Sequence, residues 1–254
     1  MMTTPEYSEL QFTVKGTECS TFSTLAPNVL LGDLQETADK GAGDCGFDRT
    51  VINKLNACWI IIRMKVHMER YPDWRETFTI RTWSRGCDKL FFNREYELYD
   101  KEGKRIGYAS SIWILADIDT HRPLIPNRID GLASPVVQQD KLVFGEICPK
   151  PKQMKIDDFM GIEPAILKFA DYSELDHNHH VNNTRYMAWV FDALYKSGVD
   201  ISAVKDFSIH YICEVKCGER VSIYVNETDF GYIVSGFKND NDTHVFDSEI
   251  YIFI

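Results

Sequence analysis

One short stretch of the chain concentrates side chains that exchange protons and form hydrogen bonds. Residues 175–183, LDHNHHVNN, hold a carboxylate, three imidazoles and three side-chain amides directly before a helical pattern. Asp176, Asn178 and His180 alternate along this stretch, so in an extended segment all three point to one side. Beside a helix N-terminus, such a set can polarise a carbonyl and stabilise an oxyanion. A helix cap next to a solvated turn uses the same residue types, so the spacing alone leaves both interpretations open.

A second candidate acid lies further along the chain. Glu214 interrupts the otherwise apolar segment IHYICEV, which has the composition of a buried strand. A buried carboxylate is costly unless it is paired, so Glu214 is a candidate general base. The alternative is a glutamate on an edge strand that faces water.

Two further patterns favour ordinary structure over a cofactor or metal site. GAGDCG at residues 41–46 fits a dinucleotide-binding glycine pattern, but a helical pattern precedes it, so glycines in a loop after that helix are the better interpretation. His177 and His179 share one face of an extended segment and His180 points away, so a metal would need a ligand from elsewhere. We therefore predict neither a cofactor nor a metal.

The elements that must position these side chains occur twice, each time as one helix followed by several strands. The first half predicts a helix over 28–40, and the second half predicts one over 182–198 with Asn182 or Asn183 as its cap. Strand patterns follow each helix, at 59–71, 76–83, 89–100 and 104–117, and at 206–215, 219–228, 231–240 and 244–254. Matching residues recur at a constant offset: His67 and His210, Glu76 and Glu219, Ile80 and Ile223.

This repetition predicts an α+β fold with two units, each an antiparallel sheet wrapped round a central helix. Prolines concentrate within residues 118–155, which indicates a crossover and linker. We expect an N-terminal unit at 1–140, a linker at 141–155 and a C-terminal unit at 156–254.

Charge and composition limit the kind of partner and location. A net charge of −10 argues against nucleic acid, because phosphate binding requires a basic face. The seven cysteines are scattered and odd in number, which is typical of reduced thiols in the cytoplasm. No stretch is long and apolar enough to span a bilayer, and the N-terminus has the composition of neither a signal nor a transit peptide. We expect a cytoplasmic protein without a membrane partner.

Several motifs occur in a fixed order along nearly the whole chain. The first half contains LLGDLQETA, WIIIRMKVHMERYPDW and ASSIWILADIDTHRPLIP, and the second contains LDHNHHVNNTRYMAWVFDAL and YICEV. In order and separation these segments resemble the acyl-acyl carrier protein thioesterases, which release free fatty acids from acyl carrier protein. The N-terminus without a transit peptide favours a bacterial-type member.

The resemblance implies a double hot-dog fold and thioester hydrolysis without metal or organic cofactor. Carried over by position, Asp176, Asn178, His180 and Glu214 match the family's catalytic residues. Plant members have cysteine directly after that glutamate, whereas this chain has Val215. A thiol nucleophile at that position is therefore excluded, and Cys213 and Cys217 are out of register.

The resemblance also implies acyl carrier protein as the partner. The first unit lacks the Asp/Asn/His set, so we expect it to line the acyl channel and to dock the acidic carrier through basic residues. Those candidates are Arg63, Lys65, Arg70, Arg75, Arg81, Arg85, Lys89, Arg94, Lys101, Lys104 and Arg105, with Lys150, Lys152 and Lys155 in the linker. Two alternatives stay open for the function: a coenzyme A thioesterase and a non-catalytic acyl-thioester sensor. Exposed sheet edges could pair two chains into a homodimer.

Overall fold

The computed structural model describes residues 5–129 and 140–252. The chain divides into two compact units, Met1–Pro149 and Lys150–Ile254. Residues 130–139 of the predicted crossover lie outside the described residues. We describe each unit by itself.

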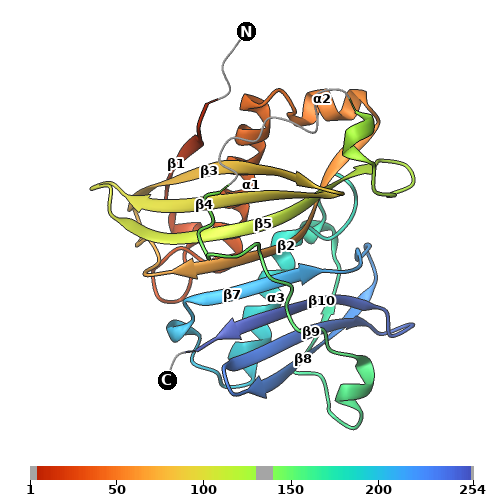
Figure 1. The fold of residues 1–254 in the computed structure, drawn as a ribbon. Helices are drawn as coiled ribbons and strands as arrows, with labels where there is room; N and C mark the ends of the chain where they lie inside the picture. The colour runs from red at the N-terminus through yellow and green to blue at the C-terminus, as the bar shows by residue number, and fades with distance from the viewer. Residues whose placement is uncertain (1–4, 130–139, 253–254) are drawn as a thin grey trace. The chain divides into compact units, whose positions relative to one another are not determined.

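The first unit is a five-stranded antiparallel sheet with one long helix. Along the chain it contains β1 (Ser8–Thr13), η1 (Gly16–Glu18), α1 (Pro27–Asp44), α2 (Arg49–Lys54), β2 (Ala57–Met68), β3 (Thr77–Asp88), β4 (Phe91–Asp100), β5 (Arg105–Asp117) and η2 (Pro126–Arg128). The strand order is β1-β3-β4-β5-β2, and α1 packs against β1 and β3 (Figure 1). The buried face of α1 consists of Leu30, Leu31, Leu34, Thr37, Ala38 and Gly41.

The second unit repeats this plan with shorter elements. It contains η3 (Ile156–Phe159), β6 (Ile166–Phe169), η4 (Tyr172–Glu174), α3 (Asn183–Lys196), η5 (Ile201–Ala203), β7 (Asp206–Tyr211), β8 (Arg220–Thr228), β9 (Gly231–Lys238) and β10 (His244–Tyr251). Within this unit the strand order is β7-β10-β9-β8-β6, and α3 packs against β6 and β8 (Figure 1). The buried face of α3 consists of Tyr186, Met187, Trp189, Val190, Ala193 and Leu194.

The two units match strand for strand. Reading β2-β5-β4-β3-β1 beside β7-β10-β9-β8-β6 gives the same order with the same antiparallel pairing. The predicted repetition of one helix and several strands is therefore confirmed. The sequence patterns did not predict the first strand of either sheet, β1 and β6, or the short helix α2.

Residues 141–144 pack on the sheet of the first unit. The indole of Trp83 donates a hydrogen bond to the carbonyl of Lys141, and the Lys141 ammonium lies 2.9 Å from a carboxylate oxygen of Glu97. The Val143 N–H donates to the buried carboxylate of Glu95 at 3.3 Å, and the ring of Phe144 packs edge-on against Tyr108. Side chains on the face of the sheet thus anchor residues 141–144.

The glycine pattern at 41–46 is not a loop that follows a helix, as predicted, because α1 continues to Asp44. Gly41 is one of its buried residues, and the Arg94 guanidinium approaches so closely that a Cβ on Gly41 would clash with it. Only Gly46, at φ +82°, lies past the helix end. Close packing explains a glycine here without any bound dinucleotide.

Candidate active site

The predicted site residues 176–180 form a tight turn, so the predicted extended arrangement is wrong. The Asp176 N–H donates to the His180 carbonyl at 2.8 Å, and the His179 N–H donates to the Asp176 carbonyl at 3.1 Å. His179 adopts φ +62°, which reverses the chain. In the described structure no neighbouring strand pairs with residues 177–179, so an extended conformation would leave their backbone groups without strand partners. The turn is therefore favoured, because its hydrogen bonds are local.

The Asp176 carboxylate holds this turn together. Its Oδ1 accepts hydrogen bonds from the backbone N–H groups of Asn178 at 2.8 Å and His180 at 3.3 Å. Asp176 and His180 are half-buried, whereas Asn178 is exposed. The carboxylate therefore fixes the backbone from which the amide and the imidazole project.

The structure brings His180 and Glu214 together. His180 Nε2 lies 3.4 Å from Glu214 Oε2, and the two side chains are 14% and 43% exposed. An imidazole and a carboxylate at this separation can exchange a proton directly or through a small displacement. The part-exposed carboxylate can also reach water.

Glu214 does not lie in a buried strand, so that prediction is wrong. β7 ends at Tyr211, and the next two N–H groups, of Ile212 and Cys213, both donate to the Val245 carbonyl at 2.9 and 3.1 Å. Two donors on one acceptor break the ladder pattern, as in a bulge. Glu214 consequently lies in the loop between β7 and β8, where its side chain projects away from the core.

Backbone hydrogen bonds fix the pairing of the two loops. The Val181 N–H donates to the Val215 carbonyl at 2.8 Å, and His180 forms an antiparallel bridge with Lys216. The Val215 N–H donates to the hydroxyl of Tyr186 in α3 at 3.2 Å. Tyr186 and Val215 were not among the residues predicted for the site, and their contact joins positions too distant in the chain for a local pattern to indicate it.

The N-terminus of α3 lies directly after the turn. Asn182 is the cap: its side-chain oxygen accepts from the Thr184 N–H at 2.9 Å, which decides between the two predicted asparagines. The Trp189 indole donates to Glu174 Oε1 at 2.8 Å, and the Glu174 carbonyl accepts the Asn182 N–H at 2.8 Å. The helix start is thus fixed from two sides, with its positive dipole end toward the turn.

The first unit contains the same turn with different side chains. There the Ser20 N–H donates to the Thr24 carbonyl at 2.7 Å, the Ser23 N–H donates to the Ser20 carbonyl at 3.1 Å, and Ser23 adopts φ +61°. By position Ser20, Phe22 and Thr24 replace Asp176, Asn178 and His180. Tyr71 occupies the place of Glu214. The turn is therefore a shared scaffold, and only the second unit carries carboxylates and an imidazole at these four positions.

Other candidate ligands and thiols lie outside a metal-binding arrangement. Among the residues that the structure describes, no three His, Cys, Asp or Glu side chains cluster closely enough to hold a metal ion. His177 and His179 are exposed. The Cys213 thiol donates to the Glu214 carbonyl at 3.5 Å, and Cys217 is exposed.

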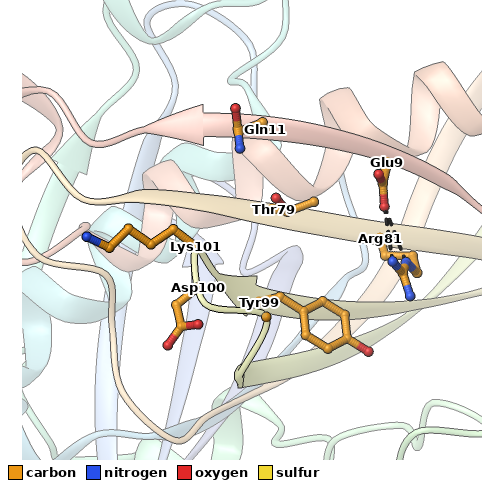
Figure 2. Close-up of a pocket in the computed structure, with 8 residues that line it drawn as sticks. Glu9, Gln11, Thr79, Arg81, Tyr99, Asp100 and Lys101 are labelled. Carbon is orange, nitrogen blue, oxygen red and sulfur yellow. Dashed lines mark hydrogen bonds and ion pairs between the residues drawn. The ribbon is translucent and has the colours of Figure 1, made fainter.

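One hollow of about 390 Å³ lies in the first unit, and its lining contains none of the four predicted catalytic residues. Figure 2 shows its lining: Arg81 is paired with Glu9, and Tyr99, Asp100 and Lys101 also belong to the lining. The Arg81 guanidinium also stacks on the Tyr99 ring at 5.2 Å. This mixed set of paired charges on an open sheet surface lacks an apolar interior for an acyl chain.

Comparison with known proteins assigns the chain to a family. The model of the acyl-ACP thioesterase N-terminal domain matches residues 8–128, and that of the acyl-ACP thioesterase C-terminal domain matches residues 167–251. The chain belongs to the acyl-ACP thioesterase family. This membership confirms the resemblance found in the ordered motifs.

Solved structures of acyl-ACP thioesterases have the same fold. An acyl-ACP thioesterase from Bacteroides thetaiotaomicron is similar with a TM-score of 0.80 and 26% identity, covering 98% of both chains. The 12:0-ACP thioesterase from Umbellularia californica gives a TM-score of 0.76 at 19% identity, covering 97% of both chains, and supports the fold alone. The predicted α+β double hot-dog fold is confirmed.

Curated acyl-ACP thioesterases are longer proteins. A chloroplastic palmitoyl-acyl carrier protein thioesterase from Gossypium hirsutum is 28% identical over 72% of this chain and 46% of its own length. Its counterpart from Arabidopsis thaliana is 29% identical over 82% of this chain and 51% of its own length. The chain thus spans about half the length of these relatives. Within residues 5–129 and 140–252, every helix is too short or too polar to cross a membrane.

Proposed function

We propose that this protein hydrolyses the thioester of fatty acyl-acyl carrier protein and releases the free fatty acid. One observation carries the proposal: the 3.4 Å pair of His180 and Glu214 lies beside the start of α3 in a chain of the acyl-ACP thioesterase family. An acid–base pair next to a helix N-terminus suits the attack of water on a carbonyl.

The proposed reaction adds water across the carbon–sulfur bond. Glu214 removes a proton from water while the water oxygen attacks the thioester carbonyl. Asn178 and the N–H groups at the α3 N-terminus stabilise the oxyanion that forms. The carbon–sulfur bond then breaks, and His180 passes to the departing thiolate the proton that Glu214 took from the water. Asp176 supports both Asn178 and His180 through their backbone N–H groups.

A second route uses the same residues. Glu214 could attack the carbonyl itself and form an anhydride, which water would hydrolyse in a second step. Labelled oxygen from water enters the Glu214 carboxylate only on this route, when water attacks the glutamyl carbonyl of the anhydride, and does not enter it when water attacks the thioester directly. Neither route requires a metal or an organic cofactor.

The proposed partner, an acidic carrier protein, requires an uncompensated basic surface. Several of the basic residues predicted for docking are held in ion pairs within the chain: Arg70 with Glu76 and Asp100, Arg81 with Glu9, and Arg105 with Glu69. The other basic residues proposed for docking are Arg63, Lys65, Arg75, Arg85, Lys89, Arg94, Lys101 and Lys104 in the first unit, with Lys150, Lys152 and Lys155 in the predicted linker. We expect the KM for carrier substrates to rise with salt and the KM for short thioesters to change little, because screening weakens charge attraction.

One comparison of substrates distinguishes the proposal from its two alternatives, a coenzyme A thioesterase and a non-catalytic acyl-thioester sensor. Acyl-carrier and acyl-coenzyme A thioesters of matched chain length should be assayed with the wild type and with Glu214→Gln. Faster turnover of the carrier substrates, lost in the variant, supports the proposal. Preference for coenzyme A thioesters supports the second enzyme class, and tight binding without turnover supports a sensor.

Location and assembly belong to the proposal as well. A cytoplasmic location is supported by the cysteines, which form no disulfide in the described residues. Each sheet taken alone ends in a short edge strand, β1 or β6, and a homodimer could form there. The mass in solution tests the homodimer directly. We propose no nucleic-acid or membrane partner.

A further inference from the structure

We propose that Tyr186 is a positioning residue for Glu214: its hydroxyl accepts the Val215 N–H and fixes the peptide that carries the acid toward His180. This inference rests on the proposed hydrolysis, in which Glu214 and His180 act as a pair. Tyr186 touches no reacting atom in this scheme and acts only through the backbone.

The backbone of Val215 connects three parts of the site: the loop that carries Glu214, the segment that follows the turn at 176–180, and the helix α3. Val215 is fully buried, so its N–H and C=O must both find partners inside the protein. The C=O accepts the Val181 N–H at 2.8 Å, and the N–H donates to Tyr186 at 3.2 Å. Since His180 directly precedes Val181 and Glu214 directly precedes Val215, these two bonds set where both side chains start.

The acceptor is held rigidly by the core of the second unit. The Tyr186 ring packs edge-on against Trp189, Tyr211 and Phe246, with centroids 5.2, 5.8 and 5.6 Å away. Only 4% of Tyr186 is exposed. Burial, with the nearby carboxylate of Glu214, raises the pKa of the Tyr186 hydroxyl, which therefore stays neutral. A fixed neutral hydroxyl is a well-defined acceptor for one backbone N–H.

The matching turn of the first unit shows that the scaffold does not need this bond. There the Leu25 N–H donates to the Pro72 carbonyl at 2.9 Å, as the Val181 N–H does to Val215. Pro72 has no N–H, and by position Leu30 replaces Tyr186. Both partners of the bond are thus missing in the unit that lacks the imidazole and the carboxylate. The bond therefore occurs in the unit that has the acid–base pair and is missing from the other unit, although both units have the turn.

Tyr186→Phe tests the inference because it removes only the acceptor oxygen. Tyr211→Phe is the matched control: its hydroxyl is also buried, next to Tyr186, and has no hydrogen-bond partner in the described part of the chain. We expect Tyr186→Phe to lower kcat roughly tenfold with little change in KM, since small displacements of a reacting group cost up to about 100-fold. Tyr211→Phe should keep the wild-type kcat.

A second pair of variants separates positioning from a general loss of structure. Val215→Pro removes the donor and copies the residue that the first unit carries at this position. If the bond is the cause, the double variant Tyr186→Phe/Val215→Pro should be no slower than the slower single variant. Equal losses of kcat and melting temperature in Tyr186→Phe and Tyr211→Phe would overturn the inference, and so would independent, multiplying losses in the double variant.

The positioning role has a readout that does not depend on turnover. In Tyr186→Phe the Val215 amide should exchange its hydrogen faster than in the wild type, while the Val181 amide keeps its rate. An unchanged rate of hydrogen exchange at the Val215 amide contradicts the inference even if the protein is shown to hydrolyse thioesters. A wild type that cleaves no thioester refutes the proposed function, and the exchange measurement still decides whether Tyr186 fixes the loop.

Discussion

A buried glutamate in the first unit should make the protein less stable as the pH rises. Glu95 in β4 is fully buried and accepts hydrogen bonds from the Ser110 hydroxyl at 3.1 Å and from the Val143 N–H at 3.3 Å. Burial raises the pKa of Glu95 from 4.5 to about 7, although both hydrogen bonds act in the opposite direction. The folded protein therefore holds a proton on Glu95 that the unfolded chain releases.

The size and sign of the effect follow from this pKa difference. At about 1.4 kcal/mol per pH unit, the shift from 4.5 to about 7 corresponds to roughly 3 kcal/mol of unfolding free energy. This stability is fully present below pH 4.5 and is lost as the pH rises through 7. Asp33, whose pKa burial also raises to about 7, changes stability in the same direction.

Glu95→Gln isolates the contribution of this one carboxyl group. A glutamine keeps an oxygen for the Val143 N–H and cannot ionise, so the variant should gain up to about 3 kcal/mol on the wild type between pH 5 and pH 8. Urea denaturation at several pH values measures this difference. The contribution of Asp33 cancels in it because both proteins contain that residue. Parallel stability curves for the two proteins would refute the reasoning.

Glu97→Gln provides the control on the same strand. Burial opposes ionisation of Glu97, but hydrogen bonds from Lys141 and Tyr99 outweigh it and lower its pKa. The Glu97 carboxylate therefore stabilises the fold above its unfolded pKa, and this stability is lost as the pH falls. Glu97→Gln should be less stable than the wild type at pH 7, opposite to Glu95→Gln.

Three further predictions concern the second unit. Asp176→Asn keeps an oxygen for the two N–H groups of the turn and should unfold like the wild type, whereas Asp176→Ala should lose about 1–2 kcal/mol in urea denaturation; equal stability of the two variants contradicts a structural role for the carboxylate. Cys213→Ala and Cys217→Ala should each hydrolyse acyl-carrier substrates at close to the wild-type rate, and a folded but inactive variant of either would revive a thiol nucleophile. Asn182→Ala should cost about 1 kcal/mol of unfolding free energy through loss of the α3 cap, and no change in the urea midpoint argues against that cap.

Local patterns in the sequence predicted the two long helices, α1 and α3, most of the strands and the family. The apolar spacing of Leu31, Leu34 and Ala38 and the candidate cap at Asn182 are short-range signals, and the structure places a helix at each. Periodicity works here because each helix buries one face against its own sheet. β1 and β6 were missed because a short edge strand depends on its partner strand more than on its own composition.

The arrangement of the site was decided by the tertiary structure. Alternation along residues 176–180 predicted an extended segment, but hydrogen bonds of Asp176 and the positive φ of His179 fold it into a turn. The apolar neighbours of Glu214 predicted a buried strand, but two N–H groups sharing the Val245 carbonyl end β7 before it.

The sequence by itself determined which residue types are present, where the two long helices form and to which family the chain belongs, because these depend on neighbours along the chain. Only the tertiary structure decided that His180 and Glu214 meet at 3.4 Å. The bond between Val181 and Val215 that sets this meeting joins two loops that α3 and β7 separate along the chain, and no local pattern encodes such a contact.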